Sequence, residues 1–132
     1  MPPILHLAIP VHDLAASKAF YVDVLGCGLG RERAEFVDVW FYGMQVTLHA
    51  RPAQVLPREQ QGVRHFGVTL DGPELAALVE RLRAHDVEWV DELTTELAGT
   101  PREQTKAKLR DPSGNVIEIK TYPDPETALG PA

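Results

Sequence analysis

One stretch of the sequence predicts a tight turn that leads into a β-strand: Asp111-Pro-Ser-Gly-Asn115, then Val116-Ile-Glu-Ile-Lys-Thr-Tyr122. Proline cannot continue a strand, and glycine and asparagine tolerate the positive φ that tight turns need. Over residues 116–122, apolar and polar side chains alternate with period two, which places Glu118 on the opposite face from the isoleucines. A carboxylate in mid-strand needs a cation, a metal ion or open solvent beside it. Glu118 is therefore the first candidate for a functional residue.

The composition indicates one soluble globular domain with a hydrophobic core. The chain has 132 residues, of which 44% are hydrophobic and 24% are charged. The net charge of −6 argues against nucleic acid or an anionic membrane as the main partner. No apolar run reaches the roughly 18 residues of a membrane span, and the start Met1-Pro2-Pro3 is unlike a signal peptide. The single cysteine, Cys27, excludes an internal disulfide, so we expect a cytoplasmic protein.

The sequence pattern predicts two successive series of elements, each with a strand, a helix and three further strands. The first series comprises a strand over 4–11, a helix between Asp13 and Gly26, and strands over 28–35, 36–42 and 44–50. The second comprises a strand over 63–70, a helix that begins at Asp71, and strands over 87–90, 104–110 and 116–122. Residues 91–103 have no clean period, which predicts a long loop.

The two series match most closely at their first and fourth strands. His6-Leu-Ala-Ile9 matches His65-Phe-Gly-Val68 in residue type at every position. Gly43-Met-Gln-Val-Thr47 aligns with Gly114-Asn-Val-Ile-Glu118 through the turn glycines. The alignment makes His6 equivalent to His65, and Thr47 equivalent to Glu118.

Four potential metal ligands share the strand parity that the bulky apolar residues avoid: His6, His49, His65 and Glu118. An antiparallel sheet packs one face on helices and leaves the other open, so we expect these side chains on an open, concave face. Imidazole nitrogen and carboxylate oxygen suit Zn, Ni, Mn or Fe, and two histidines with one carboxylate are typical of non-haem Fe(II) oxygenases. Taken singly, each histidine is more often hydrogen-bonded, and Glu118 would be satisfied by a cation such as Lys120. Their joint placement favours a metal site.

Three segments carry a resemblance to a known family: His6 to Leu14 with the helix residues up to Gly26, Arg64 to Val68, and Asp111 to Glu118. In these segments the sequence resembles the vicinal oxygen chelate superfamily, which comprises glyoxalases, bleomycin-resistance proteins and extradiol dioxygenases. The resemblance spans residues 4–122 and implies an α+β fold in which two βαβββ modules form a U-shaped open barrel. It implies one glyoxalase-like domain over 1–132. The parts of that domain are modules at about 4–50 and 63–122, a linker over 51–62 and a tail over 123–132.

The resemblance also implies a divalent metal ion, Fe, Mn, Ni or Zn, bound by one residue from the first and one from the fourth strand of each module. By direct match these ligands are His6, His65 and Glu118. The remaining position falls on Thr47, which is a poor ligand. His49 lies two residues further along the same face and is the alternative, as a fourth ligand or as a group that transfers a proton.

Family members bind a small-molecule substrate through two adjacent oxygens while the metal acts as a Lewis acid. We expect loop 91–103 to cover the entrance of the cleft, and Trp40 and Tyr42 to form its walls. For Trp40, packing on a dimer partner is the alternative. The residues expected to contact substrate oxygens are Gln45, Lys120 and Tyr122.

The resemblance leaves three functions open, and it implies a homodimer. The first is a metal-dependent enzyme: a ring-cleaving dioxygenase, a lyase or isomerase of glyoxalase type, or a transferase acting on an antibiotic. The second is a metal-free protein of bleomycin-resistance type that sequesters a drug. The intact set of His6, His65 and Glu118 argues against this second function, because a sequestering cleft has no need of metal ligands. The third is a structural or regulatory module that retains an unused site.

Overall fold

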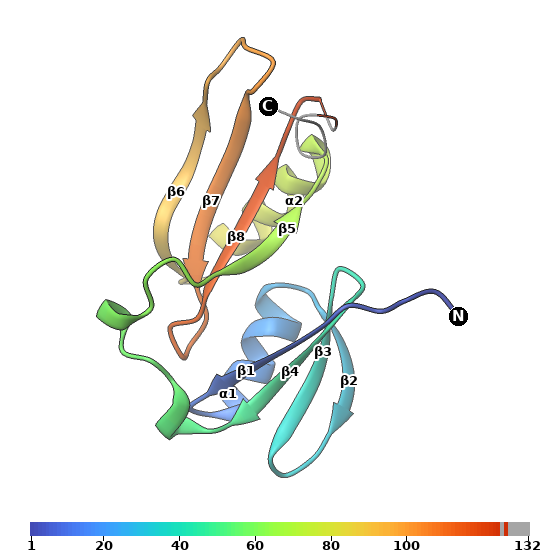
Figure 1. Ribbon diagram of the computed structural model, residues 1–132, viewed down its shortest axis with the longest axis vertical. Coiled ribbons are helices and arrows are strands. Elements are labelled where there is room, and N and C mark those ends of the chain that lie inside the picture. The colour runs from blue at the N-terminus through green and yellow to red at the C-terminus, as the bar shows by residue number, and fades with distance from the viewer. Residues whose placement is uncertain (125, 127–132) are drawn as a thin grey trace. The chain divides into compact units, whose positions relative to one another are not determined.

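The computed structural model describes residues 1–124 and 126, and the chain folds into two compact units. Unit 1 comprises Met1–Val63 with Asp111–Asn115, and unit 2 comprises Arg64–Arg110 with the described residues from Val116 onward. Each unit holds one four-stranded mixed sheet and one main helix (Figure 1). The α+β class and the βαβββ order of each unit are thus as the sequence predicts. Most of the tail expected over 123–132 lies outside the described residues.

The sheet of unit 1 has the order β1-β4-β3-β2. Its strands are β1 (His6–Val11), β4 (Met44–Ala50), β3 (Phe36–Phe41) and β2 (Gly28–Glu32). The pairing of β1 with β4 is parallel, which corrects the expectation of an antiparallel sheet. The other two pairings are antiparallel. Pro10 lies in β1, which is an edge strand of the sheet. No strand pairs with the outer side of β1, so the amide hydrogen that proline lacks costs no hydrogen bond between strands there.

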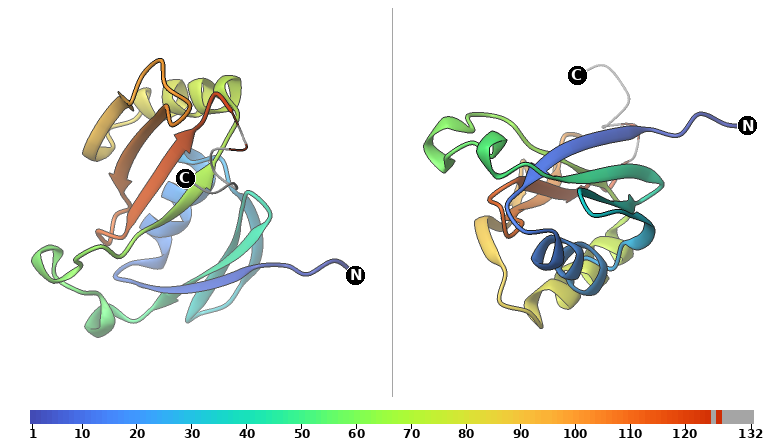
Figure 2. Two further views of the ribbon diagram at one scale, coloured as in Figure 1. Left: turned by 45° about the horizontal axis from the view of Figure 1, so that its top comes forward. Right: turned by 90° about the horizontal axis from the view of Figure 1, so that it is seen from below.

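A helix packs on one face of this sheet (Figure 2). It begins as α1 (Leu14–Ala19) and continues as η1 (Phe20–Val24). Asp13 caps it by accepting a hydrogen bond from the amide of Ala16 at 2.9 Å. The core between helix and sheet is apolar and contains the fully buried residues Tyr21, Val39, Phe41, Val46 and Leu48. We call the opposite face of the sheet the open face of unit 1. It carries the polar residues that alternate with the core residues along the strands.

The turn Asp111–Asn115, which connects two strands of unit 2, packs within unit 1. Tyr21 Oη donates to Asp111 Oδ2 at 2.8 Å, and Asn115 Nδ2 donates to the carbonyl of Pro10 at 3.2 Å. The amides of Ser113 and Asn115 both donate to Asp111 Oδ1 at 2.9 Å. Burial raises the pKa of Tyr21, and the charge of Asp111 raises it further. Asp111 therefore binds its own turn and the helix of unit 1 together.

The sheet of unit 2 has the order β5-β8-β7-β6. Its strands are β5 (Phe66–Thr69), β8 (Val116–Thr121), β7 (Gln104–Arg110) and β6 (Glu88–Glu96). Strand β5 pairs in parallel with β8, and the other pairings are antiparallel. One face is covered by α2 (Gly72–Arg83), whose amphipathic side buries Leu75, Leu78, Val79 and Leu82 (Figure 1). The other face is the open face of unit 2.

Two differences from the predicted boundaries affect residues expected at the cleft. The prediction of a loop over 91–103 is wrong for residues 91–96, because β6 continues to Glu96. Its pairing with β7 shifts register between Trp89 and Asp91 and again between Asp91 and Thr94, so no regular alternation is visible in the sequence. Strand β3 ends at Phe41, and Tyr42 lies in the following turn with a φ of 49°.

The linker between the two series contains two short 3-10 helices, η2 (Pro52–Gln54) and η3 (Arg58–Gln60). None of the helices in the described part of the chain has the length and apolar character needed to cross a membrane.

Candidate functional site

The strand registers place Thr47 and Glu118 at equivalent positions of the two units. In unit 1, Ala8 of β1 pairs with Thr47 of β4. In unit 2, Gly67 of β5 pairs with Glu118 of β8. His6 and His65 each lie two residues before the paired glycine or alanine. The alignment of the repeats that the sequence predicted is therefore the alignment of the folded strands.

The open face of unit 2 brings His65 and Glu118 together. His65 Nε2 lies 3.7 Å from Glu118 Oε2. Two ligand atoms that each lie about 2.1 Å from one ion are themselves about 3.0–3.4 Å apart. The observed separation is close to this spacing and longer than a hydrogen bond. The two atoms are thus nearly close enough to bind one ion together.

Lysines surround the carboxylate of Glu118. Lys120 Nζ lies 3.2 Å from Oε1, and Lys108 Nζ lies 3.7 Å from Oε2. Burial by itself would raise the pKa of Glu118, but the hydrogen bond from Lys120 and the charges of Lys120, His65 and Lys108 bring it below its ordinary value. Glu118 is therefore ionised at neutral pH, which is the form that binds a metal ion.

Asp38 is a buried carboxylate on the open face of unit 1, and the sequence analysis did not single it out. Its side chain is 1% exposed. It accepts hydrogen bonds from Thr47 Oγ1 at 2.6 Å, from Arg31 Nε at 2.7 Å and from Gln45 Nε2 at 3.3 Å. Thr47 lies at the position equivalent to Glu118. Its hydroxyl is engaged by Asp38 within unit 1.

The environment of Asp38 keeps it ionised. Burial by itself would raise its pKa, but hydrogen bonds from Thr47 and Arg31, together with the charges of Arg31 and His6, hold the pKa below its ordinary value. The sequence contained a signal for Asp38. It lies two residues before Trp40 on the same predicted strand, so the two side chains share a face, and that strand pairs with the strand of Thr47.

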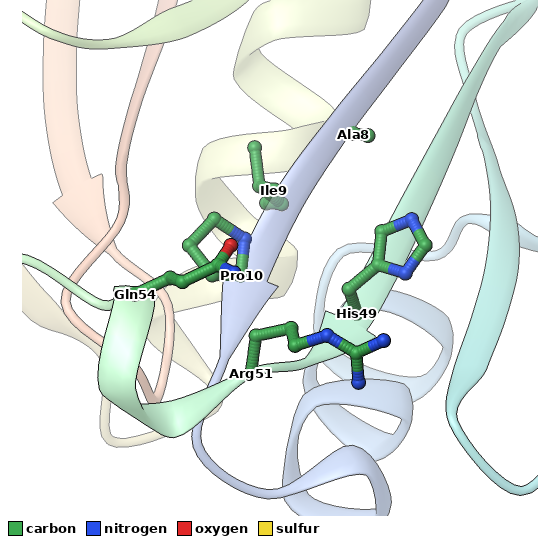
Figure 3. Close-up of a pocket in the computed structure, with 6 residues that line it drawn as sticks. All are labelled: Ala8, Ile9, Pro10, His49, Arg51 and Gln54. Atoms are coloured by element: carbon green, nitrogen blue, oxygen red, sulfur yellow. The ribbon is translucent and has the colours of Figure 1, made fainter.

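His49 lies at the far end of β4 from His6. It pairs with Pro10, whereas His6 pairs with Gln45, so four positions of parallel strand separate the two histidines. At about 3.3 Å per residue this is about 13 Å, which is too far for both to bind one metal ion. His49 instead lines a pocket of about 290 Å³ with Pro10, Arg51 and Gln54 (Figure 3).

Trp40 and Tyr42, the two aromatic residues expected to form the walls of the cleft, lie in different surroundings. Trp40 lies on β3 beside two glycines of β2: a Cβ added at Gly30 would lie 3.4 Å from Trp40 Nε1, and one added at Gly28 would lie 3.6 Å from Trp40 Cβ. The glycines therefore leave room for the indole on the open face. Tyr42, by contrast, is in the turn, and its ring packs edge-on against Phe41 with centroids 5.1 Å apart. Its expected place on the strand face is wrong, because its left-handed backbone breaks the alternation.

The family model of the Glyoxalase/Bleomycin resistance protein/Dioxygenase superfamily matches residues 3–119. The chain belongs to this superfamily. No curated protein matches the sequence.

Solved structures share the glyoxalase-type fold over almost the whole chain. A glyoxalase/bleomycin resistance protein/dioxygenase from Alicyclobacillus acidocaldarius is 29% identical, with 95% of each chain covered and a TM-score of 0.85. The fosfomycin resistance protein FosX from Listeria monocytogenes is 14% identical, with coverages of 96% and 98% and a TM-score of 0.75. Lactoylglutathione lyase from Agrobacterium tumefaciens is 20% identical, with coverages of 92% and 96% and a TM-score of 0.64. The two lower identities show the fold alone.

In this member of the superfamily the candidate metal ligands belong to different units. Within either unit, no group of three His, Cys, Asp or Glu side chains among the described residues is placed to hold a metal ion. Unit 2 holds the pair His65 and Glu118, and in unit 1 His6 lies at the position equivalent to His65. An ionised carboxylate beside an imidazole is a donor pair that fits a divalent metal.

Proposed function

We propose that this protein is a divalent-metal-dependent enzyme that binds a small substrate through two adjacent oxygens. The observation that carries the proposal is the 3.7 Å approach of His65 Nε2 to the ionised carboxylate of Glu118 on an open sheet face. Membership of a superfamily that includes glyoxalases and dioxygenases supports lyase, isomerase or dioxygenase chemistry. A homodimer is part of the proposal.

The proposed ligand set is His6, His65 and Glu118. Thr47 is left out because its hydroxyl donates to Asp38. His49 is left out because the strand register keeps it about 13 Å from His6. A three-ligand set leaves positions for the substrate. A bound Fe, Mn, Ni or Zn ion would supply Lewis acidity towards two adjacent substrate oxygens.

The residues around Glu118 have defined tasks in this proposal. The ammonium of Lys120 holds the carboxylate in place at 3.2 Å. Hydrogen bonds to Glu118 and Tyr122 raise the pKa of Lys120 above its ordinary value, although burial opposes them, so Lys120 stays charged beside the substrate. Trp40, on the open face of unit 1, remains a predicted wall of the cleft. Gln45 and Tyr122 remain predicted substrate contacts.

Metal content tests the proposal directly. Gently purified wild-type protein is expected to carry close to one metal ion per chain by elemental analysis. His65→Ala and Glu118→Gln are expected to lose it, because each removes a ligand. His85→Ala and Glu80→Gln change exposed residues of the same types in or beside α2 and are expected to retain it.

The identity of the metal then directs the search for the reaction. Iron calls for assays of O₂ consumption with catechols, and nickel or zinc calls for anaerobic turnover of a glutathione hemithioacetal. Wild-type protein that holds no metal and takes up none of Fe, Mn, Ni, Zn or Co would contradict the proposal. A screen of small-molecule drugs for tight, non-catalytic binding would then test the sequestering function.

A further inference from the structure

We propose that the substrate presents a hydrogen-bond donor, a hydroxyl or amino group, to the side-chain oxygen of Gln45, and that Asp38 is the positioning residue that orients this oxygen. This assignment rests on the proposed function and deepens it, since it names a chemical group of the substrate at a residue predicted to contact it. Both residues lie in unit 1, on the open face of its sheet.

Asp38 fixes which way round the amide of Gln45 lies. Gln45 Nε2 lies 3.3 Å from Asp38 Oδ2, and the same oxygen accepts a hydrogen bond from Arg31 Nε at 2.7 Å. An ionised carboxylate can only accept hydrogen bonds, so the amide atom that faces it must be the nitrogen. Because the oxygen and the nitrogen lie on opposite sides of the amide carbon, Gln45 Oε1 is directed away from Asp38.

The oxygen of this amide is left open to a ligand. Within the part of the chain that the structure describes, no donor bonds to Gln45 Oε1. The backbone amide of Gln45 donates to the carbonyl of Leu5 at 2.8 Å, which anchors the residue without using its side chain. A ligand that covered the amide oxygen without donating to it would leave an acceptor unsatisfied, which is costly. Gln45 therefore favours ligands that supply a hydrogen there.

Thr47, the neighbour of Gln45 on the same face of β4, does not compete for this oxygen. Thr47 Oγ1 donates its only hydrogen to Asp38 Oδ1 at 2.6 Å. Asp38 thus takes one hydrogen from each of the two side chains and leaves Gln45 Oε1 as an acceptor. His6 of β1 pairs directly with Gln45, so this acceptor belongs to the residue beside a proposed metal ligand.

Phenol and its methyl ether, anisole, form a matched pair of probes that differ in the hydroxyl hydrogen. An aromatic ring suits the test because Trp40, which is 37% exposed, lies directly opposite Gln45 in the pairing of β3 with β4. Each probe is titrated into ¹⁵N-labelled, chelator-treated protein and followed by NMR. Phenol is expected to bind wild type about fivefold more tightly than anisole, as one net hydrogen bond implies, and to shift the side-chain amide signal of Gln45.

Three variants assign the preference to the proposed residues. Gln45→Met keeps a side chain of similar length without the acceptor, and is expected to bind the two probes equally while its affinity for anisole is unchanged. Asp38→Asn offers the amide both a donor and an acceptor, so it is expected to reduce the preference for phenol. Gln60→Met changes an exposed glutamine of η3 and is expected to keep the preference. Circular dichroism verifies the fold of each protein.

Absence of phenol binding, equal affinities of wild type for the two probes, or a preference retained in Gln45→Met would overturn the inference. A preference retained in full by Asp38→Asn would overturn the positioning role of Asp38, because lost stability alone does not change the ratio of the two affinities. The metal analysis of wild type is independent of this titration. Metal binding without a preference for phenol would remove the inference alone, and the reverse result would remove the proposed enzyme function alone.

Discussion

Asp38 shows how one residue takes its role from its neighbours on adjacent strands. In the sequence it is a single acidic residue between valines of a predicted strand. In the fold it is almost completely buried and accepts hydrogen bonds from Arg31, Gln45 and Thr47. These contacts occupy the one position, Thr47, where the repeat would otherwise place a metal ligand. Asp38 thus engages the hydroxyl of Thr47, the residue at the position equivalent to Glu118.

Asp38→Asn is expected to lower the free energy of unfolding by about 1–3 kcal/mol at pH 7, because a buried charged acceptor of three hydrogen bonds is lost. The pKa of Asp38 is lowered in the folded state. Its contribution is therefore complete above the pKa of the unfolded chain, about 4, and is lost as the pH falls through the folded value. Urea unfolding from pH 7 to pH 3 measures the difference between variant and wild type.

The matched control is Asp86→Asn, which changes an exposed aspartate after α2. We expect it to leave the free energy of unfolding within about 0.5 kcal/mol of wild type at every pH. A difference for Asp38→Asn that is the same at pH 7 and pH 3 would show that the charge of Asp38 does not contribute.

Among the elements, β5 and β8 are the pair on which the candidate site depends. Gly67 of β5 pairs with Glu118, and the backbones approach so closely that a Cβ at Gly67 would lie 1.8 Å from the carbonyl oxygen of Glu118. That distance is far below any real contact, and the neighbour is backbone, which cannot rotate away. Glycine at position 67 therefore allows the backbone of β5 to lie this close to Glu118 of β8.

Gly67→Ala is expected to lower the free energy of unfolding by about 2–3 kcal/mol and to reduce metal retention, because β5 must move away from β8. Gly72→Ala is the control, since nothing lies within 4 Å of an added Cβ at the start of α2. It is expected to leave stability unchanged or slightly raised. Thermal unfolding and elemental analysis measure both effects, and equal stability of the two variants would contradict the assigned role of Gly67.

For the molecule as a whole, the turn Asp111–Asn115 makes unit 1 discontinuous in sequence. The turn packs on unit 1, while the strands on either side of it belong to unit 2. The hydrogen bond from Tyr21 to Asp111 and the one from Asn115 to the carbonyl of Pro10 hold it there. The chain therefore cannot be cut between its two series without removing part of unit 1.

Asp111→Ala is expected to lower the free energy of unfolding by about 2–4 kcal/mol, because it leaves several buried donors without an acceptor. Tyr21→Phe is expected to cost about 1 kcal/mol, because it removes one of the hydrogen bonds and keeps the ring in the core. Urea unfolding of the two variants and of the double variant measures their coupling. Strictly additive effects would show that Tyr21 and Asp111 do not act together.

The elements and the family could be predicted from local patterns. The caps at Asp13 and Asp71, the alternation in β4 and β8 and the turn glycines act over a few residues, so they are visible in the sequence. The repeat correctly made Thr47 equivalent to Glu118, because side-chain parity is a property of each strand. The extension of β6 was missed, since its register shifts interrupt that parity.

Tertiary structure decided which side chains meet. Parity put Asp38, Lys106 and Lys108 on faces of strands, but only the pairing of strands places Asp38 against Thr47, and the lysines around Glu118. It likewise separates His49 from His6, although both have the expected parity, because pairing fixes distance along a strand and parity does not. The potential metal ligands, and the strand faces on which they lie, could be read from the sequence. Hydrogen bonding between strands, which acts across long stretches of chain, determined the distances between them.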